Sequence, residues 1–318
     1  MAKFNIQHIT TYTYDEPVYD SANQIMLYPI KDAYQEVVSH RIAITNDPLI
    51  ETYTDYYGNQ VGTFTNYESH NELNISSSLE VQVKSKLLPD DKLSVEKQWE
   101  IIDGLQYDMS YINFLKKEYF DAEDELLAVV LPEERRKSTP YEVAQYFCHY
   151  VFENFKYIKG ITSVETTVDE IWKLKSGVCQ DFAHILLVML RRVGIPARYV
   201  SGYICPNQNG MRGEGATHAW VETFIPDYGW LGLDPTNNCI VQSNHVRLAV
   251  GRNFVDVSPV KGTYKGTAHH KLEVKVIISY ENDPIPQENE SKEALIVNPQ
   301  FEGNSYQRFK EMQEMQQQ

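Results

Sequence analysis

Apolar residues recur every three or four positions between residues 182 and 193, which is the spacing of one face of an α-helix. The repeat comprises Phe182, Ile185, Leu186, Met189, Leu190 and Val193. Gly177 allows a tight turn before the repeat, and the run Gly194, Ile195 and Pro196 ends it. We therefore predict a helix that begins at about Cys179 and buries one face.

Residues 217–234 follow a different pattern, because apolar and polar side chains alternate there. Residues 217–225 and 230–234 are rich in β-branched and aromatic residues, and the turn-forming sequence Pro-Asp-Tyr-Gly separates them. Pro235 cannot continue a strand ladder. The pattern predicts a β-hairpin whose first strand carries His218 and whose second strand ends at Asp234.

The strand period of two restricts how this hairpin can pair. Side chains on paired strands share a face only when their positions are opposite or offset by an even number. A two-residue turn would place the side chains of His218 and Asp234 on opposite faces of the sheet. We therefore expect three or five loop residues around 226–228, or a bulge. In the favoured register His218 lies opposite Asp234 and Trp220 lies opposite Gly232, where a glycine leaves room for the indole.

The remaining sequence divides the chain into three parts of an α+β protein. Residues 1–112 are rich in Thr, Val, Ile and Tyr with turn signals between the runs, which predicts antiparallel strands in a β-sandwich-like domain. Residues 113–282 combine helical and strand patterns and form the expected core domain. Residues 283–318 are polar and rich in Pro, Glu and Gln, so we expect a loosely held extension.

Shorter signals lie in the middle of the chain. Two capping boxes, 139–142 and 167–170, each place a threonine three residues before a glutamate and mark helix starts, the first with Pro140 at the first helical position. Residues 206–215 are polar and glycine-rich and lead directly to His218. They either border an active cleft or form a simple surface hairpin, and the pattern favours neither.

Composition restricts the partners and the compartment. The net charge of −15 argues against nucleic acid and anionic membranes, because both bind mainly through Lys and Arg. No segment is apolar enough to span a membrane, and the N-terminus shows no signal-peptide pattern. The four cysteines, at positions 148, 179, 205 and 239, have no zinc-type spacing. We expect a cytoplasmic protein with reduced thiols and no nucleic-acid or membrane partner.

The position of Cys179 favours nucleophilic chemistry. Unpaired N–H groups and the positive end of the helix dipole stabilise a thiolate at a helix start. An ordinary buried thiol is the commoner fate of a single cysteine, so position alone does not decide. A cysteine nucleophile also needs an imidazole to take its proton and a polar group to hold that imidazole. His218 and Asp234, on neighbouring predicted strands, supply both groups.

A metal enzyme is the alternative to an enzyme with a cysteine nucleophile. Zinc needs three or four converging ligands, and Cys179, His184 and His218 are the residue types available. His184 lies roughly 140° around a helix from Cys179, so the two side chains diverge. The N-terminal histidines are not grouped as ligands, and we interpret them as surface or packing residues: His8, His40 and His70. We therefore expect no metal and no cofactor.

Four ordered segments together resemble the transglutaminase-like superfamily, and more closely its bacterial cysteine-protease branch. They are GVCQDFAHI at 177–185, GIPARYVSGY at 194–203, THAWVE at 217–222 and GWLGLDPTNN at 229–238. Residues 7–18 and 55–64 are similar to the β-rich domain that precedes the core in that branch. The resemblance implies a papain-like core with Cys179 as nucleophile, His218 as base and acid, and Asp234 as orienting carboxylate.

This resemblance implies acyl transfer on amide bonds of peptide or protein substrates. Hydrolysis is the default expectation, because water is always present and its exclusion requires a specific amine site. Transglutaminase-type cross-linking and a catalytically silent binding module stay open, although the intact catalytic set argues against the silent module. The backbone N–H of Cys179 is the natural first oxyanion donor. Candidates by type for the second donor, among which the sequence selects none, are Tyr157, Trp172 and Gln180.

Overall fold

The computed structural model describes residues 1–90, 92–130, 137–163, 166–205, 211–213 and 215–280. The described chain divides into two compact units, one formed by Val83–Val257 and the other by Ala2–Gln82 together with the residues from Ser258 to Tyr280. We describe each unit by itself.

These units differ from the domains expected from the sequence, whose boundaries lay at residues 112 and 282. Helix α1 (Val95–Gly104) belongs to the Val83–Val257 unit, and strands β13 and β14 belong to the unit of the N-terminal strands. Residues on both sides of the core domain thus build one β-rich unit, because strands far apart in sequence pair with each other. The expected extension, 283–318, lies outside the described residues.

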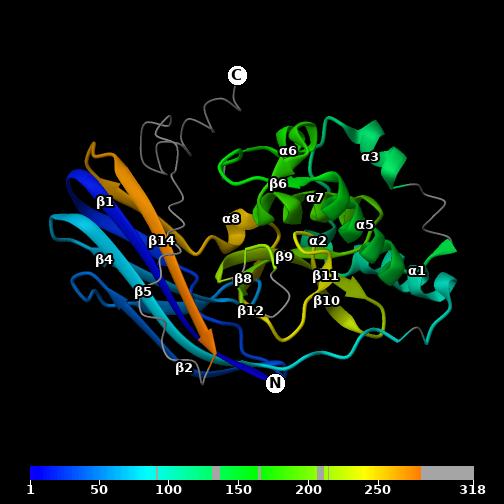
Figure 1. Cartoon of the computed structure of the whole chain (residues 1–318), viewed down its shortest axis with the longest axis horizontal. Helices are drawn as coiled ribbons and strands as arrows, with labels where there is room; N and C mark the ends of the chain where they lie inside the picture. The colour runs from blue at the N-terminus through cyan, green and yellow to red at the C-terminus, as the bar shows by residue number, and fades with distance from the viewer. Residues whose placement is uncertain (91, 131–136, 164–165, 206–210, 214, 281–318) are drawn as a thin grey trace. The chain divides into compact units, whose positions relative to one another are not determined.

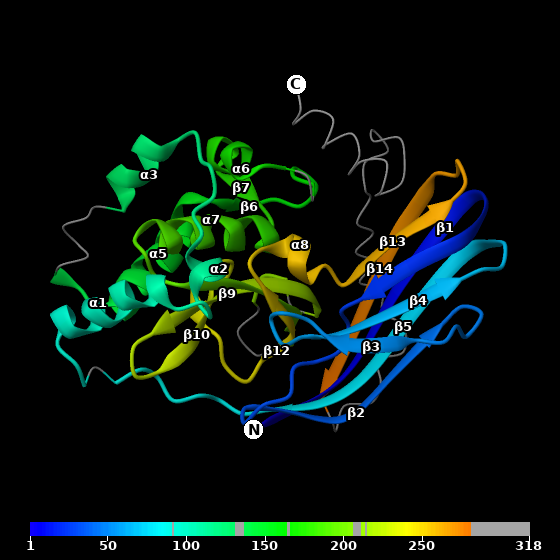
Figure 2. The ribbon, with the colours of Figure 1, turned by 180° about the vertical axis from the view of Figure 1, so that it is seen from behind.

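The regular elements in the described part of the β-rich unit are all strands. They are β1 (Ala2–Ile25), β2 (Gln35–Ile44), β3 (Glu51–Thr54), β4 (Gln60–Asn66), β5 (His70–Val83), β13 (Val260–Lys265) and β14 (His270–Tyr280). The strand order is β2-β5-β1-β4-β3, and β13 and β14 also pair with β1 (Figures 1 and 2). The first half of β1 pairs with β14 and its second half with β4 and β13, all antiparallel.

The core of this unit follows the strand period of two. In β5, alternate side chains such as Leu73, Ile75 and Val81 are buried while most of those between them stay accessible, which is the pattern of a sheet with one covered face. His8 and His70 are buried and His40 is half-buried, so these histidines pack into the unit rather than group as ligands.

The Val83–Val257 unit contains the helices. Its elements, besides α1, are η1 (Leu105–Tyr107), α2 (Ile112–Leu115), α3 (Glu123–Val129), α5 (Pro140–Asn154), β6 (Lys156–Tyr157), α6 (Val168–Leu174), β7 (Ser176–Gly177), α7 (Cys179–Arg192), β8 (Ala197–Ile204), β9 (Ala216–Ile225), β10 (Gly229–Asp234), β11 (Cys239–Ile240), β12 (His245–Gly251) and α8 (Phe254–Val257). An antiparallel sheet of order β11-β10-β9-β8-β12 lies against α5 and α7 (Figures 1 and 2). This is the predicted α+β class. Within the described residues, no helix combines the length and apolar character needed to cross a bilayer.

The predicted helix starts are confirmed. Thr139 and Thr167 each accept a hydrogen bond from the backbone of the glutamate three residues later, and each glutamate accepts one in return. Helix α7 begins at Cys179, as predicted. It is buried more completely than the expected single face, since Leu187 and Val188 are covered as well. The reason is that α5, α6 and the sheet all pack against it.

Candidate active site

The helix start that carries Cys179 is fixed by a buried carboxylate. Oδ2 of Asp181 accepts hydrogen bonds from the Val178 N–H at 2.7 Å and from the Thr162 hydroxyl at 2.6 Å. Burial raises the pKa of Asp181, and these two hydrogen bonds oppose that rise. A side chain at Gly177 would collide with this carboxylate. Sequence reasoning missed Asp181, although an acidic residue in the first turn of a predicted helix is a readable signal.

The hairpin that carries His218 and Asp234 has the predicted parity but not the predicted register. Its loop is three residues long, 226–228, as expected for an odd loop. Gly232, however, pairs with Glu222 rather than with Trp220. Continuing this register sets Asp234 opposite Trp220, two positions along the strand from His218. Because the offset is even, the two side chains still share a face, and Asp234 reaches His218 diagonally.

The glycine that makes room for the indole is also not the expected one. A Cβ at Gly232 would meet Val241, whereas a Cβ at Gly202 would lie 2.6 Å from Cη2 of Trp220. Trp220 is fully buried, and its ring packs against those of His218 and His245. Gly202 lies on strand β8, where it pairs with His218. The room for the Trp220 indole therefore comes from β8 and not, as expected from the sequence, from β10.

His218 and Asp234 form a buried pair. Nε2 of His218 lies 2.8 Å from Oδ2 of Asp234, and neither side chain has any exposed surface. Burial alone would lower the pKa of His218, but the charges of Asp234 and Cys179 and the hydrogen bonds to both raise it. Burial would likewise raise the pKa of Asp234, yet His218 and His245 hold it well below its usual range. The pair therefore favours imidazolium and carboxylate together.

The other nitrogen of the His218 ring faces the thiol. Nδ1 is buried and has no hydrogen-bond partner among the described residues. Because Asp234 occupies Nε2, the interaction with Cys179 that raises the pKa of His218 falls to Nδ1. Cys179 is half-buried at the first position of α7. The structure thus brings together the three residues that the sequence singled out.

The described part of the 206–215 loop borders this nitrogen. A Cβ at Gly213 would lie 3.2 Å from Nδ1 of His218, and the φ of Gly213 is +76°. Asn237 holds the neighbouring backbone, since its amide exchanges hydrogen bonds with the N–H and carbonyl of Arg212. This favours the first of the two expectations for the loop, a position beside the site. Residues 206–210 and 214 lie outside the described residues.

Asp234 also serves the turn that follows it. The Thr236 N–H donates to Oδ1 at 2.9 Å, and the Asn237 amide donates to Oδ2 at 2.8 Å. This carboxylate therefore has two functions, one in the turn and one toward His218. In the folded chain one carboxylate performs both, with a separate oxygen directed to the backbone.

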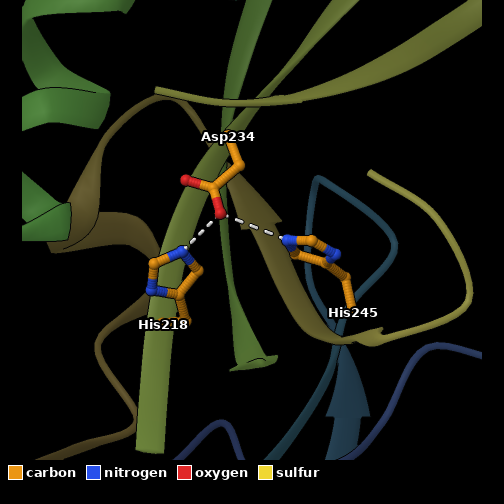
Figure 3. Close-up of side chains that lie close together, drawn as sticks. All are labelled: His218, Asp234 and His245. Atoms are coloured by element: carbon orange, nitrogen blue, oxygen red, sulfur yellow. Dashed lines mark hydrogen bonds and ion pairs between the residues drawn. The ribbon is translucent and has the colours of Figure 1, made fainter. Parts of the chain in front are cut away.

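A second histidine contacts the same carboxylate. Nε2 of His245, the first residue of β12, lies 3.3 Å from Oδ2 of Asp234, and both side chains are buried (Figure 3). Burial lowers the pKa of His245, with Asp234 acting in the opposite direction. Sequence reasoning missed this residue. Its only local signal is a strand pattern, and nothing near it in sequence indicates its partner.

These side chains are also the ones to test as metal ligands. One ligand atom each from His218, Asp234 and His245 lie within 4.8 Å of one another. Oδ2 of Asp234, however, already accepts hydrogen bonds from both histidines and from Asn237. We therefore interpret the three residues as a hydrogen-bonded cluster. His184 is directed elsewhere, because its Nε2 accepts a hydrogen bond from the Phe254 N–H.

The structure reduces the number of candidates for the second oxyanion donor from three to two. Nε1 of Trp172 donates to Glu125 at 2.8 Å, so this N–H is already committed. Tyr157, whose ring packs against Phe182, and Gln180, the second residue of α7, stay as candidates.

Comparisons with known proteins agree with this fold. Residues 131–235 match the model of the Transglutaminase-like superfamily, and residues 4–82 match that of the Bacterial transglutaminase-like N-terminal region. An uncharacterised protein of Mycobacterium leprae is 31% identical over 283 residues, which cover 88% of this chain and 99% of that protein. The chain belongs to the transglutaminase-like superfamily.

Two further similarities are informative. The crystal structure of a protein named as a putative cysteine protease, from Cytophaga hutchinsonii, covers 92% of this chain and 96% of its own with a TM-score of 0.67 and 20% identity, and so shares the fold. A protein-glutamine gamma-glutamyltransferase of Pseudomonas aeruginosa is 38% identical over 80 residues, or 24% of this chain and 12% of that protein.

Proposed function

We propose that this protein is a thiol-dependent acyl-transfer enzyme that hydrolyses amide bonds of peptide or protein substrates. Cys179 is the nucleophile, His218 is the general base and acid, and Asp234 orients His218. The observation that carries the proposal is the buried 2.8 Å contact between His218 and Asp234, with Nδ1 of His218 left for the thiol. A charged imidazole beside a cysteine at a helix start stabilises the thiolate that the reaction needs.

The steps follow from these positions. The Sγ proton of Cys179 passes to Nδ1 of His218, and the thiolate attacks the substrate carbonyl carbon. The resulting oxyanion accepts a hydrogen bond from the backbone N–H of Cys179. The C–N bond breaks, His218 returns its proton to the departing amine, and a thioester forms. Water then loses a proton to His218 and attacks the thioester, which releases the carboxylic acid and restores the thiol.

The first experiment measures iodoacetamide labelling of each cysteine against pH, with peptide mapping by mass spectrometry. We expect Cys179 to react below neutral pH and His218→Ala to move its profile upward. Cys239 is a matched internal control, because it is also half-buried while burial and Asp234 raise its pKa to about 12. A Cys179 profile equal to that of an ordinary thiol would sink the proposal.

The second experiment identifies the acyl donor. The protein is incubated with peptide libraries, quenched with acid, and examined for an adduct on Cys179, with Cys179→Ser as the control. An adduct that appears in the wild type and is absent from the variant supports acyl transfer. Failure to form any adduct with a reactive Cys179 favours the silent binding module.

Cross-linking is the second candidate, supported by the similarity to the Pseudomonas gamma-glutamyltransferase. The two reactions share the thioester and differ only in the group that attacks it. Adding a fluorescent primary amine to the donor reaction separates them. Release of the free acid with little amine incorporation supports hydrolysis, whereas amide formation as the main product supports cross-linking.

A further inference from the structure

Asp234 is shared between two histidines that come from different strands. His218 lies on β9 and His245 opens β12, and both direct Nε2 at the same oxygen, Oδ2 (Figure 3). The distances are 2.8 Å for His218 and 3.3 Å for His245. The proposed mechanism uses only the contact between His218 and Asp234, and it gives no role to the contact between His245 and Asp234.

The place of His245 in the sheet makes the contact informative. Strands β9 and β8 separate β10 from β12 in the strand order, so a flat sheet would set the last two about 14 Å apart. The contact of 3.3 Å between His245 and Asp234 therefore requires the sheet to curl until the end of β10 meets the start of β12. Trp220 fills the space beneath, with its ring against both imidazoles.

The chemistry of the cluster fixes the direction of the second hydrogen bond. The charged groups that face His245 are Asp234 from β10 and His218 from β9. Burial and the charge of His218 both lower the pKa of His245, so its ring is neutral beside an ionised carboxylate. A neutral imidazole carries one proton, and a carboxylate can only accept, so that proton lies on Nε2. Its Nδ1 lies 3.1 Å from Oδ1 of Asn244, and a ring protonated on Nε2 accepts a hydrogen bond at Nδ1 once this amide turns its nitrogen toward the ring.

We propose that His245 is a positioning residue that donates a second hydrogen bond to Asp234 and holds Oδ2 toward His218. The inference rests on the proposed function, because it gives Asp234 the task of orienting His218. Thr236 and Asn237 also bind Asp234, but both belong to the turn that follows it. His245 is the donor that ties the carboxylate to a strand on the far side of the sheet, so the carboxylate keeps its orientation if the turn shifts.

The test compares His245→Leu, which removes the donor, with His245→Gln, whose amide nitrogen can replace Nε2. The readout is the pH profile of Cys179 labelling by iodoacetamide, taken on variants whose circular dichroism matches the wild type. We expect His245→Leu to move the profile upward by about one pH unit, because a carboxylate without this donor holds His218 less firmly in place. His245→Gln should return most of that shift. A residue that only fills space would not show this recovery.

Two further measurements keep the outcomes distinct. His218→Ala is run in parallel: if it leaves the profile unchanged, the proposed function fails, and if it moves the profile while His245→Leu does not, only this inference fails. Nitrogen NMR of histidine-labelled wild-type protein needs no variant. We expect the Nε2–H tautomer for His245 at neutral pH, and an Nδ1–H tautomer would overturn the proposal.

Discussion

The two compact units each bury a histidine in an antiparallel sheet, and the two histidines behave oppositely. In the β-rich unit, burial lowers the pKa of His8 to about 4, with the Thr10 hydroxyl 3.1 Å from its Nε2. In the other unit, the equally buried His218 has a raised pKa, because Asp234 and Cys179 outweigh the same burial. Burial by itself makes a histidine neutral, and at His218 the charges of Asp234 and Cys179 reverse that effect.

Removing that carboxylate gives the largest expected effect. Asp234→Asn leaves a buried imidazole without its counter-charge, so the pKa of His218 should fall toward the value of His8 and the protein should lose about 3–5 kcal/mol of stability. Thr10→Val is the matched change beside His8, and we expect only about 1 kcal/mol from it, because the ring there is neutral. Urea unfolding and histidine NMR measure both quantities. A His218 that stays charged at neutral pH in Asp234→Asn would contradict the comparison.

The pH dependence of stability should differ in sign between the two histidines. His8 has a folded pKa of about 4, below its unfolded value of about 6.5, so the unfolded chain binds the proton first as pH falls. Its contribution of about 3 kcal/mol is therefore lost between about pH 6.5 and 4. His218, with a raised pKa, contributes below about pH 6.5 and loses its contribution as pH rises through the folded value.

His8→Gln isolates the first of these terms. As the pH falls from 7 to 4, the unfolding free energy of the wild type should decrease relative to that of His8→Gln. His70→Gln, at a buried position in the same unit, is the control for removing a histidine from this sheet. An equal response from the two variants would show that the acid sensitivity does not come from His8.

The smallest expected effect on stability concerns Gly213, which lies next to Nδ1 of His218. Gly213 and Gly215 have φ values of +76° and +77°, so alanine at either position costs about 1 kcal/mol of backbone strain. Only at Gly213 does the added Cβ approach Nδ1 of His218, at 3.2 Å, while at Gly215 it meets open space. We expect similar melting temperatures for the two alanine variants but slower Cys179 labelling in Gly213→Ala alone. Equal labelling rates would place the loop away from the reacting atoms.

Several features of the site were readable from the sequence because they are local. The start of α7 at Cys179 follows from the glycine before it and the apolar period after it. The capping boxes at Thr139 and Thr167 need only three residues of separation. The parity of the β9–β10 hairpin follows from the alternation of side chains, and so the shared face of His218 and Asp234 could be predicted.

Other features depended on contacts that no local pattern contains. The hairpin register shifted by two residues, since parity restricts pairing to even offsets but does not choose among them. Gly202 on β8, rather than Gly232, makes room for Trp220, and that follows from the pairing of β8 with β9. The β-rich unit takes β13 and β14 from the far end of the chain.

By itself, the sequence determined which residues are chemically able to act and which faces they occupy, because helix and strand periods are properties of a few neighbouring residues. Only the tertiary structure decided that His245 reaches Asp234, because this requires the sheet to curl across β9 and β8. The protonation of the cluster was likewise decided by folding. A histidine has the same side chain at positions 8, 218 and 245, but the burial and charges around each one lower the pKa of His8 and His245 and raise that of His218.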